Sequence, residues 1–235
     1  MKFTVSKELF EVLGEACFGV VAVQGLDNNL DLPVIRQDLA EQIAAREAEF
    51  ENKKVKEDAQ IVPYREAFQA LGINPNKYMC SIEALLSRIA KKKGMPNINA
   101  GVDLGNAVSL KYCLPMGAHD LDTMQGDIEI RRAAGQDTFV PFGETVAETP
   151  DAGEMVYVSG HTVRTRRWTW RQSEHGKITA ATSSIFYPID GFKNVNEAKV
   201  LAARDELAAK AKSLFNCKVI TGFVDKHSPE FELTF

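Results

Sequence analysis

The segment from Val102 to Asp120, VDLGNAVSLKYCLPMGAHD, places polar side chains inside an apolar frame. Asp103 and Asn106 stand among valines and leucines, and His119 follows a Pro-Met-Gly turn. A helix that only fills a core does not require carboxyl, amide and imidazole groups at these positions. Such groups move protons or hold polar ligands in proteins. The segment therefore contains the strongest candidates for chemistry in the chain.

His119 is the best placed of the four histidines, because it follows a predicted helix and stands beside an acid. A purely structural histidine explains the same position equally well. The other three, His161, His175 and His227, stand in or near predicted turns, where side chains are usually exposed. We therefore expect no chemistry from those three.

The segment Arg164–Glu174, RTRRWTWRQSE, holds both tryptophans of the chain. One extended strand would place Arg164, Arg166, Trp168 and Trp170 on one face and Thr165, Arg167, Thr169 and Arg171 on the other. Two interpretations are open. The strand lines a ligand site, where arginine binds anions and tryptophan offers a stacking surface, or it has a buried tryptophan face and an exposed arginine face.

Motifs for common cofactors are absent from the sequence. It contains no Gly-x-Ser-x-Gly, no P-loop, no Gly-x-Gly-x-x-Gly and no His-Glu-x-x-His. The cysteines, at positions 17, 80, 113 and 217, lack the spacing of zinc ligands and are interpreted as buried, reduced thiols. The sequence thus predicts neither a cofactor nor a metal site.

The first half of the chain has a mainly helical pattern. The apolar, β-branched run Cys17–Asp27 predicts a buried strand. Helices are predicted at Leu32–Glu57, Pro63–Ile73, Ser81–Gly94 and Leu104–Lys111. Ser81 is the predicted N-cap of the third helix, and Lys91-Lys92-Lys93 fill its last turn. There lysines complement the helix dipole, so nucleic-acid contact is only a second interpretation.

From Gly126 onward the pattern changes to short strands separated by Gly, Pro and Asp. A long amphipathic helix follows at Asn194–Asn216, and CKVITGFV is a last predicted strand. This order predicts an α+β layered fold. No linker or repeat interrupts the chain, so residues 1–235 are expected to form one domain.

Length and charge restrict the function further. The 235 residues carry a net charge of −4, which argues against strong non-specific binding of nucleic acid. No run approaches the roughly 18 apolar residues of a membrane span, and Met1–Leu13 lacks a signal-peptide core. A cytoplasmic location is therefore expected, with no membrane and no DNA as partner.

Against this background, Val102–Glu144 resembles the B3/B4 domain of the bacterial phenylalanyl-tRNA synthetase β subunit. That domain carries a Val-Asp-Val-Thr-Asn-Tyr-Val run and then Pro-Met-His-Ala-Phe-Asp. The matching positions are Val102, Asp103, Asn106, Val108, Pro115, Met116, Ala118 and Asp120, and Gly126-Asp127-Ile128 opens the following strand. A looser similarity covers 64–189, and the remaining segments are expected to pack on that core.

The resemblance implies a three-layer α+β sandwich with a pocket for the aminoacyl end of a tRNA. It also implies trans-editing, the hydrolysis of an amino acid wrongly attached to a tRNA. In that reading His119 and Asn106 are the catalytic candidates. The candidate substrate-binding residues are Arg88, Asn99, Asp103, Met116, Gly117, Arg167, Trp168, Trp170 and Arg171.

The sequence departs from the family pattern at three places. The family's Gly-rich segment before the acidic pocket residue is absent, and the arginine and tryptophan segment occupies that region. The family histidine of Pro-Met-His is Gly117 here, and the family phenylalanine is His119. The family glutamate near the last strand of the domain has no counterpart in Ser183–Tyr187. Three hypotheses therefore remain: a deacylase of mischarged tRNA, a non-catalytic module that binds tRNA, another RNA or an amino acid, and a different small-molecule enzyme on the same fold.

Overall fold

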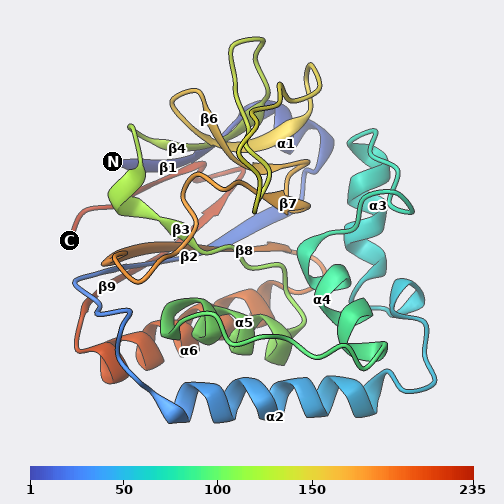
Figure 1. The fold of residues 1–235 in the computed structure, drawn as a ribbon. Helices are drawn as coiled ribbons and strands as arrows, with labels where there is room; N and C mark the ends of the chain where they lie inside the picture. Colours follow the sequence, from blue (N-terminus) through green and yellow to red (C-terminus); the bar gives the residue numbers. More distant parts are fainter.

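Two β-sheets lie face to face, and helices cover the outer face of one of them (Figure 1). This computed structural model describes all residues from 1 to 235. One sheet has six strands in the order β10 (Glu230–Glu232), β1 (Lys2–Val5), β4 (Ile128–Arg132), β5 (Met155–Ser159), β6 (Thr162–Arg166) and β7 (Arg171–Gln172). The other has four, in the order β3 (His119–Asp120), β8 (Ser184–Phe192), β2 (Ala16–Gln24) and β9 (Lys218–Asp225).

The α-helices are α1 (Lys7–Val12), α2 (Pro33–Glu49), α3 (Val62–Ala70), α4 (Ser81–Ala90), α5 (Ala100–Tyr112) and α6 (Glu197–Phe215). The four-stranded sheet forms the middle layer, with α5 and α6 against its outer face and α2 beyond them (Figure 1). Short 3-10 helices occur at Val55–Glu57 and Leu121–Thr123. The predicted three-layer α+β architecture is therefore confirmed. None of the helices has the length and hydropathy needed to cross a membrane.

Strand β2 is buried on both faces, which explains its nearly continuous apolar sequence. Phe18, Val20 and Ala22 belong to the core between the two sheets. Cys17, Val21 and Val23 point the other way, into the core between the middle sheet and the helices.

Strand β8 has the same alternation. Ile185, Tyr187 and Ile189 pack toward the helices, and Phe186 packs between the sheets. Because side chains alternate along a strand, Pro188 and Asp190 also face the space between the sheets. A carboxyl group is thereby placed in a position that an apolar side chain would normally occupy.

Several predicted boundaries shift in the structure. The helix predicted at 32–57 ends at Glu49, after which the buried Phe50 leaves the helix. Helix α4 has Cys80, not Ser81, at its N-cap position, and the N–H of Ser81 donates instead to the carbonyl of Thr169 at 2.8 Å. Helix α5 begins at Ala100, four residues before the prediction. The short elements β1, α1, β3 and β10 were not predicted.

The single strand predicted across the arginine and tryptophan segment is wrong. Strand β6 ends at Arg166, and the chain turns through residues 167–170 before β7 begins at Arg171. Arg167 and Trp168 have φ angles of 47° and 59°, a left-handed conformation that reverses the chain and is uncommon outside glycine. The predicted alternation of faces therefore stops at Arg166.

Candidate functional site

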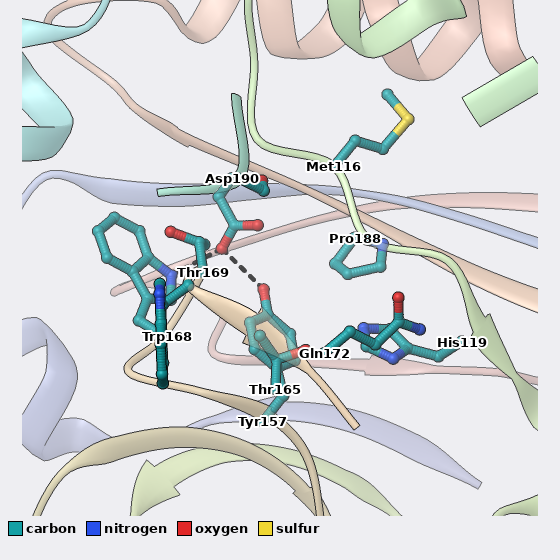
Figure 2. A pocket seen from close by; sticks show the side chains of 12 residues that line it. Met116, His119, Tyr157, Thr165, Trp168, Thr169, Gln172, Pro188 and Asp190 are labelled. Carbon is teal, nitrogen blue, oxygen red and sulfur yellow. Dashed lines mark hydrogen bonds between the residues drawn. The ribbon is translucent and has the colours of Figure 1, made fainter. Parts of the chain in front are cut away.

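A cavity of about 70 Å³ opens between the two sheets at the end of β8. That volume has room for on the order of five water molecules or a small ligand group. We call it the inner pocket (Figure 2). It is lined by Ser81, Met116, Gly117, His119, Tyr157, Thr165, Trp168, Thr169, Trp170, Gln172, Pro188 and Asp190.

Asp190 is the ionisable group at the centre of this pocket. Its Oδ1 accepts hydrogen bonds from the Tyr157 hydroxyl and from Nε1 of Trp168, both at 2.7 Å. Figure 2 shows the carboxyl group of Asp190 directed toward the Tyr157 hydroxyl. Its Oδ2 accepts no hydrogen bond from the protein, which leaves that oxygen available to a ligand. Burial raises the pKa of Asp190 to about 7, although the two hydrogen bonds act in the opposite direction.

The backbone of Asp190 is held from two further directions. Its N–H donates to the carbonyl of Pro115 at 3.0 Å, and its carbonyl accepts from the hydroxyl of the buried Tyr64 at 2.9 Å. Tyr64 in turn accepts from the amide of Asn196 at 2.9 Å. These contacts hold the carboxyl group in place before any ligand arrives.

His119 forms part of the pocket wall from β3, the edge strand beside β8. It is only 2% exposed, and its ring stacks on Tyr157 and Phe186 with centroid distances of 5.9 and 6.2 Å. Burial, together with the positive charge of Arg164, lowers the pKa of His119 to about 3. The imidazole is therefore neutral at physiological pH. Its Nδ1 has no hydrogen-bond partner.

The imidazole ring of His119 fills the space that a side chain at position 117 would occupy. A Cβ atom on Gly117 would lie 2.8 Å from Nε2 of His119 and 3.2 Å from Cγ of Pro188. The imidazole thus fills the space next to position 117, where the family pattern has a histidine side chain. A side chain at 117 and the imidazole at 119 cannot both be accommodated without movement.

A second hollow, of about 160 Å³, adjoins the inner pocket and shares Met116, Gly117 and Gln172 with it. We call it the outer hollow. Asn106 and Lys177 line it, and the amide of Asn106 makes no hydrogen bond within the protein. Its remaining lining residues are Ile98, Val102, Gly105, Ala118, Phe142 and Ile178, of which Phe142 is 54% exposed.

Three predicted substrate-binding residues have other positions. Asn99 caps α5 by accepting from the N–H of Val102 at 3.0 Å, and Asp103 accepts from the N–H of Ile98 at 2.9 Å. Both line a separate hollow near the start of α2. Arg88 is exposed, and it donates to the carbonyl of Gly94 at 2.7 Å beyond the end of α4. The structure does not bring these side chains to the inner pocket.

Only the tryptophans of the predicted arginine and tryptophan wall reach the pocket. Arg167 pairs with Asp151 at 2.6 Å, and its guanidinium carbon lies 4.0 Å from the centroid of the Tyr78 ring. Arg171 pairs with Glu144 at 3.0 Å. Both guanidinium groups are thus already occupied by acidic partners.

Sequence reasoning did not identify Asp190 and Tyr157 as site residues. The signal for Asp190 was present in SIFYPID, where an acid continues the buried alternation of Phe186 and Pro188. Tyr157 gives no such signal, because an aromatic residue is ordinary in a strand. No three His, Cys, Asp or Glu side chains gather closely enough to hold a metal ion.

Comparison with known proteins identifies the family of the chain. The family model described as the B3/4 domain matches residues 63–215, well over half of the chain. The chain therefore belongs to the B3/4 domain family. No curated protein sequence matches it significantly.

A solved structure with similarity is an N-terminal fragment of the phenylalanyl-tRNA synthetase β subunit from Pyrococcus horikoshii. The sequences are 13% identical, the TM-score is 0.47, and the similarity covers 92% of this chain and 49% of that one. The chain thus spans about half the length of that fragment.

Proposed function

We propose that the chain hydrolyses the ester bond between an amino acid and the 3′ end of a tRNA that carries the wrong amino acid. The observation that carries this proposal is the junction of two hollows at Met116 and Gly117. The inner pocket has a size suited to a small amino-acid side chain, and its walls combine aromatic and apolar surface with several polar side chains. The outer hollow offers the exposed Phe142 ring, against which a terminal base can stack.

In this proposal each polar group of the site has a separate role. Oδ2 of Asp190, which has no partner in the protein, accepts a hydrogen bond from a donor on the bound amino acid. Nε2 of His119, the ring nitrogen on the side of Gly117, holds the attacking water, since the imidazole is neutral. Asn106 donates from its free amide to the carbonyl oxygen as negative charge develops there.

The reaction needs no cofactor. Water adds to the ester carbonyl carbon, and the bond from that carbon to the ribose oxygen then breaks. The ribose oxygen leaves with the proton that the water gives up, so the products are a free amino acid and an uncharged tRNA. Because the ester is already reactive, a held water, an oxyanion donor and a selective pocket suffice.

The test is deacylation of a panel of tRNAs charged with correct and incorrect amino acids. We expect selective release from at least one mischarged species, and at least tenfold slower release by Asn106→Ala and Asp190→Asn. Asn194→Ala is the matched control, because Asn194 is exposed and lies outside both hollows. If the folded protein cleaves no member of the panel faster than a blank, the hydrolase proposal is wrong.

One observation favours a second candidate, a module that binds the aminoacyl end without turnover. A group with a pKa of about 3 is a weak proton acceptor at neutral pH, which limits His119 as a general base. A binding module gains thermal stability with ligand but releases no product. This candidate would be favoured if an oligonucleotide ending in CCA raises the melting temperature of the protein, and if the protein does not hydrolyse the aminoacyl ester of the charged oligonucleotide.

A further inference from the structure

Six exposed lysines gather at one end of the molecule from two segments that are distant in sequence. Lys53, Lys54 and Lys56 follow α2, and Lys91, Lys92 and Lys93 follow α4. The two segments border one hollow of about 570 Å³, which Lys53, Lys54, Lys56 and Lys91 help to line. We call these six residues the lysine patch.

Most of this charge is not neutralised within the protein. Lys54 pairs with Glu57 at 3.1 Å, and Lys92 lies 3.9 Å from Glu51. No acidic group lies within ion-pair distance of the other four lysines. The chain as a whole has a net charge of −4, so the patch is a local exception to an acidic molecule.

The dipole of α4 explains only half of the patch. Lys91, Lys92 and Lys93 stand at the C-terminal end of that helix, where positive charge is favourable. Lys53 and Lys54 precede the 3-10 helix Val55–Glu57 and Lys56 lies within it, so all three stand beyond the last turn of α2 and are not explained by an α-helix dipole. Their placement opposite the end of α4 brings six lysines around a hollow that only two acids, Glu51 and Glu83, also line, so a bound anion would relieve the remaining repulsion.

Helix α4 connects the patch to the proposed site. Its first residue, Ser81, lines the inner pocket, and its last turn leads into Lys91 (Figure 1). Ten residues of α-helix span about 15 Å. In double-stranded DNA one strand carries a phosphate about every 3.4 Å along its axis; at a similar spacing in RNA, this distance corresponds to roughly four phosphates.

We propose that the lysine patch binds the phosphate backbone of the tRNA whose 3′ end enters the inner pocket. The inference rests on the proposed function for the identity of the RNA. Lysine suits this role because a flexible ammonium group contacts phosphate without requiring a fixed geometry. The patch contributes affinity and leaves the chemistry of the ester to the pocket.

The first experiment measures binding of uncharged tRNA by fluorescence anisotropy over a range of salt concentrations. The test variant combines Lys53→Glu with Lys91→Glu, one lysine from each segment, both of which line the hollow without a paired acid. The control combines Lys212→Glu with Lys218→Glu, which makes the same charge change at exposed positions near the end of α6 and in β9. Lys212 also matches Lys91 in its position at a helix C-terminus.

We expect the patch variant to bind at least about tenfold more weakly at low salt, with a salt slope reduced by about two. The control should bind within about twofold of the unmodified chain. Equal losses of tRNA affinity in the patch variant and the control would mean that only the net charge of the protein matters. That result would overturn the proposal. Loss of binding to anionic lipid vesicles with unchanged binding to tRNA would also overturn it.

A second measurement separates this inference from the proposed function. The substrate is a short oligonucleotide that carries the ester but has no stem to reach the patch. The patch variant should hydrolyse it at the unmodified rate while its KM for charged tRNA rises. An unchanged KM for tRNA would reject the patch and leave the hydrolase intact. If neither protein hydrolyses any ester but tRNA binding still depends on the patch, only the hydrolase proposal is rejected.

Discussion

The hydroxyl of Tyr157 donates to Oδ1 of Asp190 across the space between the two sheets, at 2.7 Å. This bond joins β5 of one sheet to β8 of the other. Nε1 of Trp168 donates to the same oxygen, so one carboxyl group connects both sheets with the turn that follows β6. Interior packing and the chemistry of the pocket therefore depend on the same atoms.

Tyr157→Phe removes one of the two donors to Asp190. We expect a loss of about 1–3 kcal/mol in the free energy of unfolding at pH 8, where the carboxyl group is charged. The pKa of Asp190 should also rise, since the Tyr157 hydrogen bond lowers it. Urea unfolding and carboxyl ¹³C NMR measure the two effects. Tyr112→Phe is the control: its hydroxyl donates to Glu206, so the Asp190 titration should not move.

Asp190→Asn should change how stability depends on pH. The folded-state pKa of about 7 lies above the ordinary aspartate value of 3.8. Between these values the folded chain keeps a proton that the unfolded chain has lost, so stability falls as the pH rises and reaches a plateau above pH 7. Asparagine retains an oxygen acceptor for both donors and carries no charge.

The expected result is therefore a variant that is more stable than the unmodified chain at pH 8 and similar to it at pH 4. About 1.4 kcal/mol accompanies each pKa unit, so the difference should be on the order of 2–4 kcal/mol. Unfolding in urea from pH 4 to pH 8 measures it. Parallel pH profiles for the two proteins would show that Asp190 is not buried as described.

Gly117→Ala tests the packing of the imidazole of His119. The added methyl group would lie 2.8 Å from Nε2, so we expect a loss of about 1–3 kcal/mol. In the background of His119→Ala the same change should cost less by at least about 1 kcal/mol. Gly135→Ala is the control, because no atom lies within 4 Å of its added Cβ. Additive costs in the double variant would contradict the contact.

Asn106 and Asp103 stand three residues apart on α5 but should respond differently to alanine. Asp103 is 2% exposed and accepts from the N–H of Ile98, so Asp103→Ala should cost about 1–3 kcal/mol of stability. Asn106 has no partner in the protein, so Asn106→Ala should change stability by less than about 0.5 kcal/mol while lowering deacylation. A large loss of stability with Asn106→Ala would assign it a structural role.

The layered fold followed from patterns that operate over many residues. The apolar run of β2 and the helical spacing of apolar residues in α6 both extend over many residues. A single exception therefore does not hide either pattern. The turn at Arg167 and Trp168 was hidden, because left-handed conformations are usually indicated by Gly, Asn or Asp. Tertiary contacts hold the turn instead: the N–H of Trp168 donates to the carbonyl of Met155 at 2.6 Å.

The candidate site was only partly predictable for a related reason. His119, Asn106, Met116 and Gly117 come from one segment, and the sequence indicated that segment through its density of polar groups. Asp190 and Tyr157 reach the pocket from separate strands, one in each sheet. Their meeting depends on strand pairing over long separations, which a local pattern does not contain.

Strand β1 lies between β4 and β10, so residues from both ends of the chain are neighbours in one sheet (Figure 1). Its pairing with β10 joins Lys2 to Glu232 and Phe3 to Phe231. During synthesis on a ribosome, β1 is made well before β10. The outer edge of β1 therefore stays uncovered until β10 has been made. Until then that edge can pair with other chains, and folding of the sheet is slowed by the long loop that must close.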